Sequence, residues 1–115
     1  RMIDNEGKAV YWQKKPELKC SMTVLGLDKS GNILFLFARS PYSANEFIDF
    51  MLAPGLQIQT AMYLEGGPES TLYVKTKKTE IEKFGSYVSY SKPDDTNTEV
   101  RKMPNVLGIR KKMND

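Results

Sequence analysis

The apolar residues of this chain gather in short runs whose spacing is typical of β-strands. Four such runs cover residues 20–28, 33–38, 60–64 and 70–75. The first two are joined by a short turn that contains Gly31, as in a β-hairpin. The run over 33–38 is apolar at six successive positions, which predicts an interior strand that is covered on both faces.

A helical pattern follows over residues 43–53. Its apolar residues recur at the spacing of one helix face, and they are Phe47, Ile48, Met51 and Leu52. Ser43 and Glu46 stand at the spacing of a capping box, and Pro54 with Gly55 ends the pattern. We therefore expect an α+β fold, in which an antiparallel-rich mixed sheet carries one main helix, about residues 43–53, packed on one face.

The second half of the chain is less regular. A polar, charged connection is expected over residues 75–83, a short strand over 87–90 and a last strand over 106–110. Four phenylalanines of the central segment are expected in the core, and they are Phe35, Phe37, Phe47 and Phe50.

The composition fits a single globular domain over residues 1–115. Hydrophobic residues make up 40% and charged residues 27% of the chain, a balance that argues against disorder. The formal net charge of +3 is too small to indicate a nucleic-acid partner. The chain has no histidine, which excludes Ser-His-Asp and Cys-His nucleophile arrangements within it. The single cysteine, Cys20, excludes an internal disulfide, and no apolar run approaches the ~20 residues that span a bilayer.

The most distinctive stretch is a loop that follows an apolar run and reads Leu64-Glu65-Gly66-Gly67-Pro68-Glu69-Ser70-Thr71. The two glycines let the backbone turn sharply and allow a ligand to approach closely. The two carboxylates suit proton transfer, sugar hydroxyls or a metal ion, and the backbone amides suit phosphate. A β-turn with solvated acids explains the same residues equally well on local chemistry.

A second candidate position lies between the strand over 33–38 and the helix. Arg39 is the best-placed cation there, because a guanidinium binds phosphate oxygens in a bidentate manner. The helix N-terminus that Ser43 caps is itself favourable for an anion. A solvated loop arginine is the alternative interpretation.

The loop and its setting resemble the phosphodiester glycosidase family, which includes the lysosomal uncovering enzyme. The family signature is an apolar strand followed by Asn-Leu-Asp-Gly-Gly-Gly-Ser-Ser, and here residues 63–70 are Tyr-Leu-Glu-Gly-Gly-Pro-Glu-Ser. Segments 42–48 and 104–109 also resemble parts of that family. The resemblance covers roughly residues 20–75 and 101–110, and it implies that the chain is the C-terminal half of such a domain.

Several positions depart from the family pattern. Glu65 replaces the signature Asp, Pro68 replaces the third Gly, and Glu69 replaces the first Ser. The family's Arg-Thr-Ala-hydrophobic-Gly strand is Met-Thr-Val-Leu-Gly over residues 22–26, so its Arg is missing. The family's Asn-Gly-Gly-Phe segment is not found in this sequence, which starts at Arg1 rather than at a methionine. The resemblance therefore implies either an upstream segment or chain that completes the domain, or a diverged form without activity.

The resemblance implies a hydrolase that cleaves a sugar-1-phosphodiester or a related glycosidic bond. The alternative is a catalytically inactive module that binds glycan or packs against another chain. In the first hypothesis Glu65 and Glu69 are the catalytic carboxylates, and a divalent metal ion is an open option, with no other cofactor. The substrate-binding residues are then Arg39, Ser43, Gly66, Gly67, Ser70 and Thr71. The resemblance also implies a secreted, periplasmic or cell-envelope protein, of bacterial or lysosomal type.

Overall fold

The computed structural model of the chain describes residues 1–13, 18–88 and 95–113. Strands β1 (Lys19–Asp28) and β2 (Ile33–Tyr42) form a hairpin, and helix α1 (Ala44–Met51) follows. After the short 3-10 helix η1 (Pro54–Leu56), strand β3 (Ile58–Gly66) returns to the sheet. The remaining elements are the 3-10 helix η2 (Gly67–Glu69) and strands β4 (Thr71–Lys75), β5 (Glu80–Phe84) and β6 (Tyr87–Val88).

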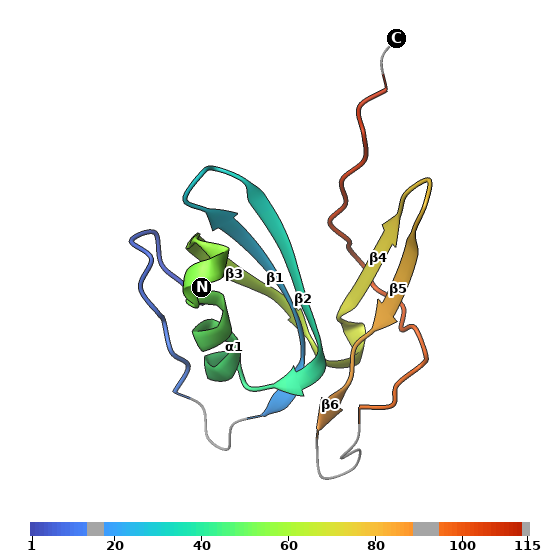
Figure 1. The fold of residues 1–115 in the computed structure, drawn as a ribbon. Coiled ribbons are helices and arrows are strands. Elements are labelled where there is room, and N and C mark those ends of the chain that lie inside the picture. The colour runs from blue at the N-terminus through green and yellow to red at the C-terminus, as the bar shows by residue number, and fades with distance from the viewer. Residues whose placement is uncertain (14–17, 89–94, 114–115) are drawn as a thin grey trace.

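The named strands pair in an antiparallel manner in the part of the chain that the structure describes. The main sheet has the order β2-β1-β3, and β6 pairs with the first residues of β1. Strands β4 and β5 form a separate two-stranded sheet. Figure 1 shows this hairpin standing apart from the main sheet, with β2 between it and α1 in that view. The expected α+β fold with an antiparallel sheet and one main helix is confirmed.

Helix α1 forms where the capping box predicts it. The Ser43 hydroxyl accepts a hydrogen bond from the Glu46 N–H (3.1 Å), and the Glu46 carboxylate accepts one from the Ser43 N–H (2.8 Å). The residues that α1 buries are Phe47, Ile48 and Met51. Leu52, expected on the same face, is the C-cap residue and is 38% exposed.

The core lies between α1 and one face of the main sheet. It is small, and its buried hydrophobic members are Met2, Ile3, Met22, Val24, Phe47, Ile48, Met51, Ile58 and Ala61. Met22 and Val24 belong to this face, so the intervening Thr23 and the next residue, Leu25, point to the other face.

The other face of the main sheet is apolar, and the described residues leave much of it uncovered. The register places Leu25 opposite both Phe35 and Met62, and Leu27 opposite Ile33. These five residues define what we call the open face. Ile33 is 62% exposed, Met62 48% and Phe35 42%, which is far more than a covered sheet face allows.

The expectation of an interior strand over residues 33–38 is wrong, because β2 is the edge strand of the main sheet. The side chains of its unbroken apolar run alternate between the two faces of the sheet. Leu34 and Leu36 pack against the core, whereas Phe35 lies on the open face. The expectation that Phe35, Phe37 and Phe50 belong to the core is therefore wrong. Phe37 pairs with Thr23 on the same face as Phe35, and Phe50 is 53% exposed.

Two further expectations are wrong in the second half of the chain. The polar connection expected over 75–83 contains most of β5, which pairs with β4. No strand forms over 106–110, because no described strand pairs with that segment. Of the short strand expected over 87–90, residues 87 and 88 form β6, while 89 and 90 lie outside the described residues.

Candidate functional site

The glycine loop, residues 65–70, connects the main sheet to the β4–β5 hairpin. Strand β3 ends at Gly66, and η2 turns the chain at once. Gly67 has a φ of 77°, a left-handed conformation that strongly favours glycine. Gly67 and Pro68 are buried, so the turn is fixed in the structure rather than free in solvent. The Gly-Gly-Pro sequence thus produces a rigid corner directly after Glu65.

Glu65 stands at the start of this corner with its side chain exposed. Its carboxylate accepts a hydrogen bond from the Gly66 N–H (3.0 Å). Its carbonyl oxygen accepts hydrogen bonds from the hydroxyls of Ser70 (2.9 Å) and Thr23 (3.3 Å). The backbone of Glu65 is therefore held firmly while its carboxylate remains accessible to a ligand.

Glu65 is paired in register with Thr23, so it belongs to the face of the sheet opposite α1. Ser43 caps α1 on the covered side, where it is buried and engaged in the capping box. The structure therefore does not bring Glu65 and Ser43 into one cleft.

Glu69 faces a cation that the sequence pattern did not single out. The Arg101 guanidinium lies 3.2 Å from the Glu69 carboxylate, and both side chains are partly exposed. An exposed ion pair of this kind contributes little to stability. It does place a positive charge beside the glycine loop. Arg101 lies 32 positions further along the chain, so no local motif signals this contact.

Ser70 and Thr71 differ in how their hydroxyls are used. Ser70 is fully buried, and its hydroxyl donates to the Glu65 carbonyl oxygen. The Thr71 hydroxyl is shielded from solvent and has no hydrogen-bond partner among the residues that the structure describes. A buried hydroxyl without a partner costs about 1–3 kcal/mol. Neither hydroxyl is free at the surface in this arrangement.

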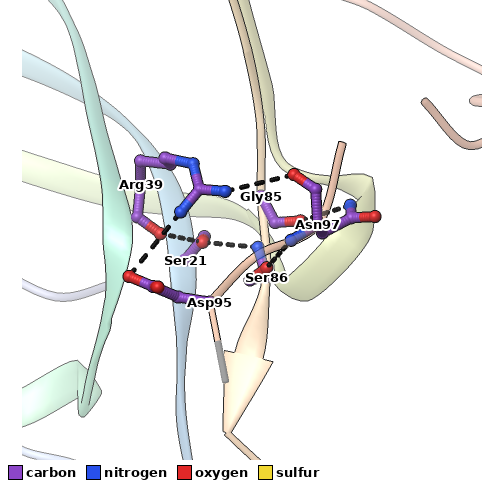
Figure 2. A network of polar contacts seen from close by, with 6 residues as sticks. All are labelled: Ser21, Arg39, Gly85, Ser86, Asp95 and Asn97. Carbon is purple, nitrogen blue, oxygen red and sulfur yellow. Dashed lines mark hydrogen bonds and ion pairs between the residues drawn. The ribbon is translucent and has the colours of Figure 1, made fainter. Parts of the chain in front are cut away.

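Arg39 takes part in a polar network at the end of β2, which is drawn in Figure 2. Its guanidinium lies 3.6 Å from the Asp95 carboxylate and donates to the Asn97 carbonyl oxygen at 3.1 Å. Its own carbonyl oxygen accepts a hydrogen bond from the Ser21 hydroxyl. Arg39 is thus already paired with an acid, which leaves less of its charge for a phosphate.

A cluster of half-buried side chains lies on the other side of Gly66. A Cβ atom at Gly66 would lie 2.1 Å from the Tyr63 hydroxyl and 3.0 Å from Cys20 Sγ, so a side chain here would have to displace the Tyr63 ring. Burial, with smaller contributions from Cys20 and Glu65, raises the pKa of Tyr63 to about 12. Burial also raises the pKa of the Cys20 thiol, although the Gly67 N–H acts in the opposite direction. Trp12 completes the cluster with an edge-on contact to Tyr63.

Within residues 1–13, 18–88 and 95–113, no group of three or more Cys, Asp or Glu side chains is placed to hold a metal ion. No described helix is long and apolar enough to cross a membrane.

Comparison with known protein families places the chain beside one of them. The family model described as phosphodiester glycosidase matches residues 1–110. That range includes the glycine loop, the helix and most of the C-terminal segment. Searches of curated proteins and of solved structures returned no match.

Proposed function

Because the chain belongs to the phosphodiester glycosidase family, we propose that it hydrolyses the glycosidic bond of a sugar-1-phosphodiester. The observation that carries the proposal is the accessible Glu65 carboxylate at the start of a rigid glycine corner. Glycoside hydrolysis depends on a carboxylate held beside the anomeric carbon. The fixed backbone of Glu65 supports that role, because it limits where the carboxylate can move.

In the proposed reaction, water adds to the anomeric carbon and the bond from that carbon to the phosphate oxygen breaks. The products are the free sugar and a phosphomonoester. A phosphomonoester has a second pKa of about 6, so it leaves without strong help from an acid. The step therefore needs a nucleophile or general base more than a general acid. We assign this role to Glu65.

The phosphate of the substrate needs positive charge or N–H donors nearby. Arg101 is a candidate, because its pairing with Glu69 places it beside the loop. Glu69 then acts as the second carboxylate of the site by holding this cation. The amides of Gly66 and Gly67 and the guanidinium of Arg39 remain candidates, although Arg39 would have to share its charge with Asp95.

The alternative function is a catalytically inactive module that binds glycan or packs against another chain. The departures from the family signature at Glu65, Pro68 and Glu69 favour it. So do the structural contacts of Ser43 and Arg39, which account for both residues without a ligand.

We also propose that an upstream segment or a separate chain covers the open face and completes the domain. The exposure of Ile33, Phe35 and Met62 supports this, as does the outer edge of the apolar strand β2, with which no described strand pairs. The family resemblance further supports a protein that acts outside the cytoplasm. If a covering segment is supplied in the same polypeptide, Phe35 should become protected from solvent. Unchanged hydrogen exchange over residues 33–38 would argue against the cover.

The function is tested with Glu65→Gln, which keeps the shape of the side chain and its acceptor for the Gly66 N–H. We expect the loss of hydrolysis of a sugar-1-phosphodiester with an unchanged melting temperature. Glu82→Gln, at an exposed glutamate of β5, is the matched control and should keep full activity. A variant Glu65→Gln that hydrolyses like the wild type would remove Glu65 from the reaction. Glycan binding by a wild type that hydrolyses nothing would support the alternative.

A further inference from the structure

Ser21 occupies a special position in the main sheet, at the point where two strands meet along one side of β1. Met22 pairs with Gly66 at the end of β3, and Cys20 pairs with Tyr87 at the start of β6. Ser21 lies between these two pairs. The chain therefore leaves the sheet at Gly66, forms the glycine corner and the β4–β5 hairpin, and returns to the same side of β1 past Ser21.

The Ser21 side chain is completely buried at this point, and its hydroxyl both donates and accepts a hydrogen bond. Its hydroxyl donates to the Arg39 carbonyl oxygen and accepts from the Ser86 N–H (2.6 Å). Its own N–H donates to the Ser86 carbonyl oxygen at 2.6 Å. Figure 2 shows the hydroxyl bridging β2 and Ser86. Gly85 and Ser86, which connect β5 to β6, form what we call the returning segment. The bridge spans a place where the β1–β2 register shifts between Cys20 and Met22.

The returning segment in turn packs directly on the glycine loop. Gly85 donates its N–H to the Ser70 carbonyl oxygen at 2.7 Å. A Cβ atom at Gly85 would lie 2.3 Å from the Gly67 carbonyl oxygen and 2.9 Å from the Ser21 Cβ. A shift of Gly85 would therefore move the glycine loop directly, because the two backbones are in contact with no flexible side chain between them.

We propose that Ser21 is the positioning residue of the glycine loop, acting through Ser86 and Gly85. The hydroxyl fixes the returning segment, that segment fixes Gly67 and Ser70, and the Ser70 hydroxyl fixes the Glu65 carbonyl oxygen. Ser21 touches no ligand. It sets where the Glu65 carboxylate points. The inference rests on the proposed function only for its kinetic consequence, because the positioning itself is a property of the fold.

The test compares Ser21→Ala with Ser40→Ala, at an exposed serine of β2. Ser21→Ala leaves the Ser86 N–H and the Arg39 carbonyl oxygen without their partner in a buried site. We expect amide hydrogen exchange at Ser70, Gly85 and Ser86 to become at least about tenfold faster. Exchange at the centre of the β1–β2 hairpin should not change, and Ser40→Ala should behave as the wild type. If the protein hydrolyses a sugar-1-phosphodiester, kcat should fall about tenfold at constant KM, since orientation and not binding is lost.

A second variant covers the case in which Ser21→Ala does not fold. The Asn97 amide donates to the Gly85 carbonyl oxygen at 2.7 Å from the outer side of the network. Asn97→Ala should therefore accelerate exchange at Gly85 and Ser86 in the same way. Faster exchange spread evenly over the whole sheet, or unchanged exchange at Ser70 and Gly85, would overturn the proposal. If amide exchange is faster only at these residues in the variants, and the wild type hydrolyses no sugar-1-phosphodiester, the positioning role is upheld and the enzymatic function is rejected.

Discussion

The buried hydroxyl of Thr71 gives the most discriminating prediction for the glycine loop. Thr71 begins β4, and its Oγ1 atom is shielded from solvent without a hydrogen-bond partner among the described residues. In the unfolded chain the same hydroxyl is hydrated. Folding therefore loses a hydrogen bond to water here and gains none from the part of the chain that the structure describes.

Thr71→Val replaces this hydroxyl with a methyl group of similar shape. Burying an unpaired hydroxyl costs about 1–3 kcal/mol, so its removal should raise the free energy of unfolding by about 1 kcal/mol. For a domain of this size the melting temperature should rise by about 4 °C. Thermal unfolding followed by circular dichroism measures the change directly.

Thr76→Val is the matched control, because it makes the same chemical change where the hydroxyl is used. The Thr76 hydroxyl accepts from the N–H groups of Lys78 (3.2 Å) and Thr79 (3.0 Å) in the turn between β4 and β5. This variant should lose about 0.5–1 kcal/mol. A Thr71→Val variant that melts at or below the wild-type temperature would refute the reasoning. Weaker substrate binding without stabilisation would instead restore Thr71 as a ligand contact.

Three further predictions concern the helix cap, the corner and the half-buried Tyr63. Ser43→Ala should cost about 1 kcal/mol of stability and leave ligand binding unchanged, and a loss of binding at wild-type stability would contradict the capping role. Gly85→Ala should cost about 2 kcal/mol or more, because its Cβ atom would lie 2.3 Å from the Gly67 carbonyl oxygen, and a wild-type melting curve would show that the contact relaxes freely. The raised pKa of Tyr63, about 12 against an ordinary 10.0, means that its contribution to stability is complete below pH 10 and is lost as the pH rises toward 12. Tyr63→Phe should therefore flatten this alkaline fall in unfolding free energy, and an unchanged pH profile would disprove the assignment.

The local features of the fold could be predicted from the sequence because their causes are local. The capping box at Ser43 and Glu46 lies within four residues, and it forms as expected. The hairpin of β1 and β2 follows from two apolar runs around Gly31, which has a φ of 87°. The position of Glu65 at the end of a strand followed from the glycines after it, whereas the exposure of its side chain did not.

Contacts between distant segments could not be predicted in the same way. The apolar run in β2 suggested an interior strand, but strand order depends on pairing partners and not on the run itself. The pairing of Glu69 with Arg101 and the bridge from Ser21 to Ser86 join segments 32 and 65 positions apart. Serine in a strand carries no signal of burial, so the buried hydrogen bonds of Ser21 emerged only from the structure.

The measurement that tests the central proposal most directly is hydrolysis of a sugar-1-phosphodiester in water enriched with oxygen-18. Glycosidic cleavage transfers the water oxygen to the anomeric carbon, so the label should appear in the free sugar, and the other product should be an unlabelled phosphomonoester. Glu65→Gln should form neither product, because that variant should not turn over. Label in the phosphate would show cleavage of a phosphorus–oxygen bond and contradict the proposed reaction. The same assay is run on a wild-type polypeptide that includes an upstream segment covering the open face. If that protein releases no sugar, an enzymatic role for the loop is contradicted.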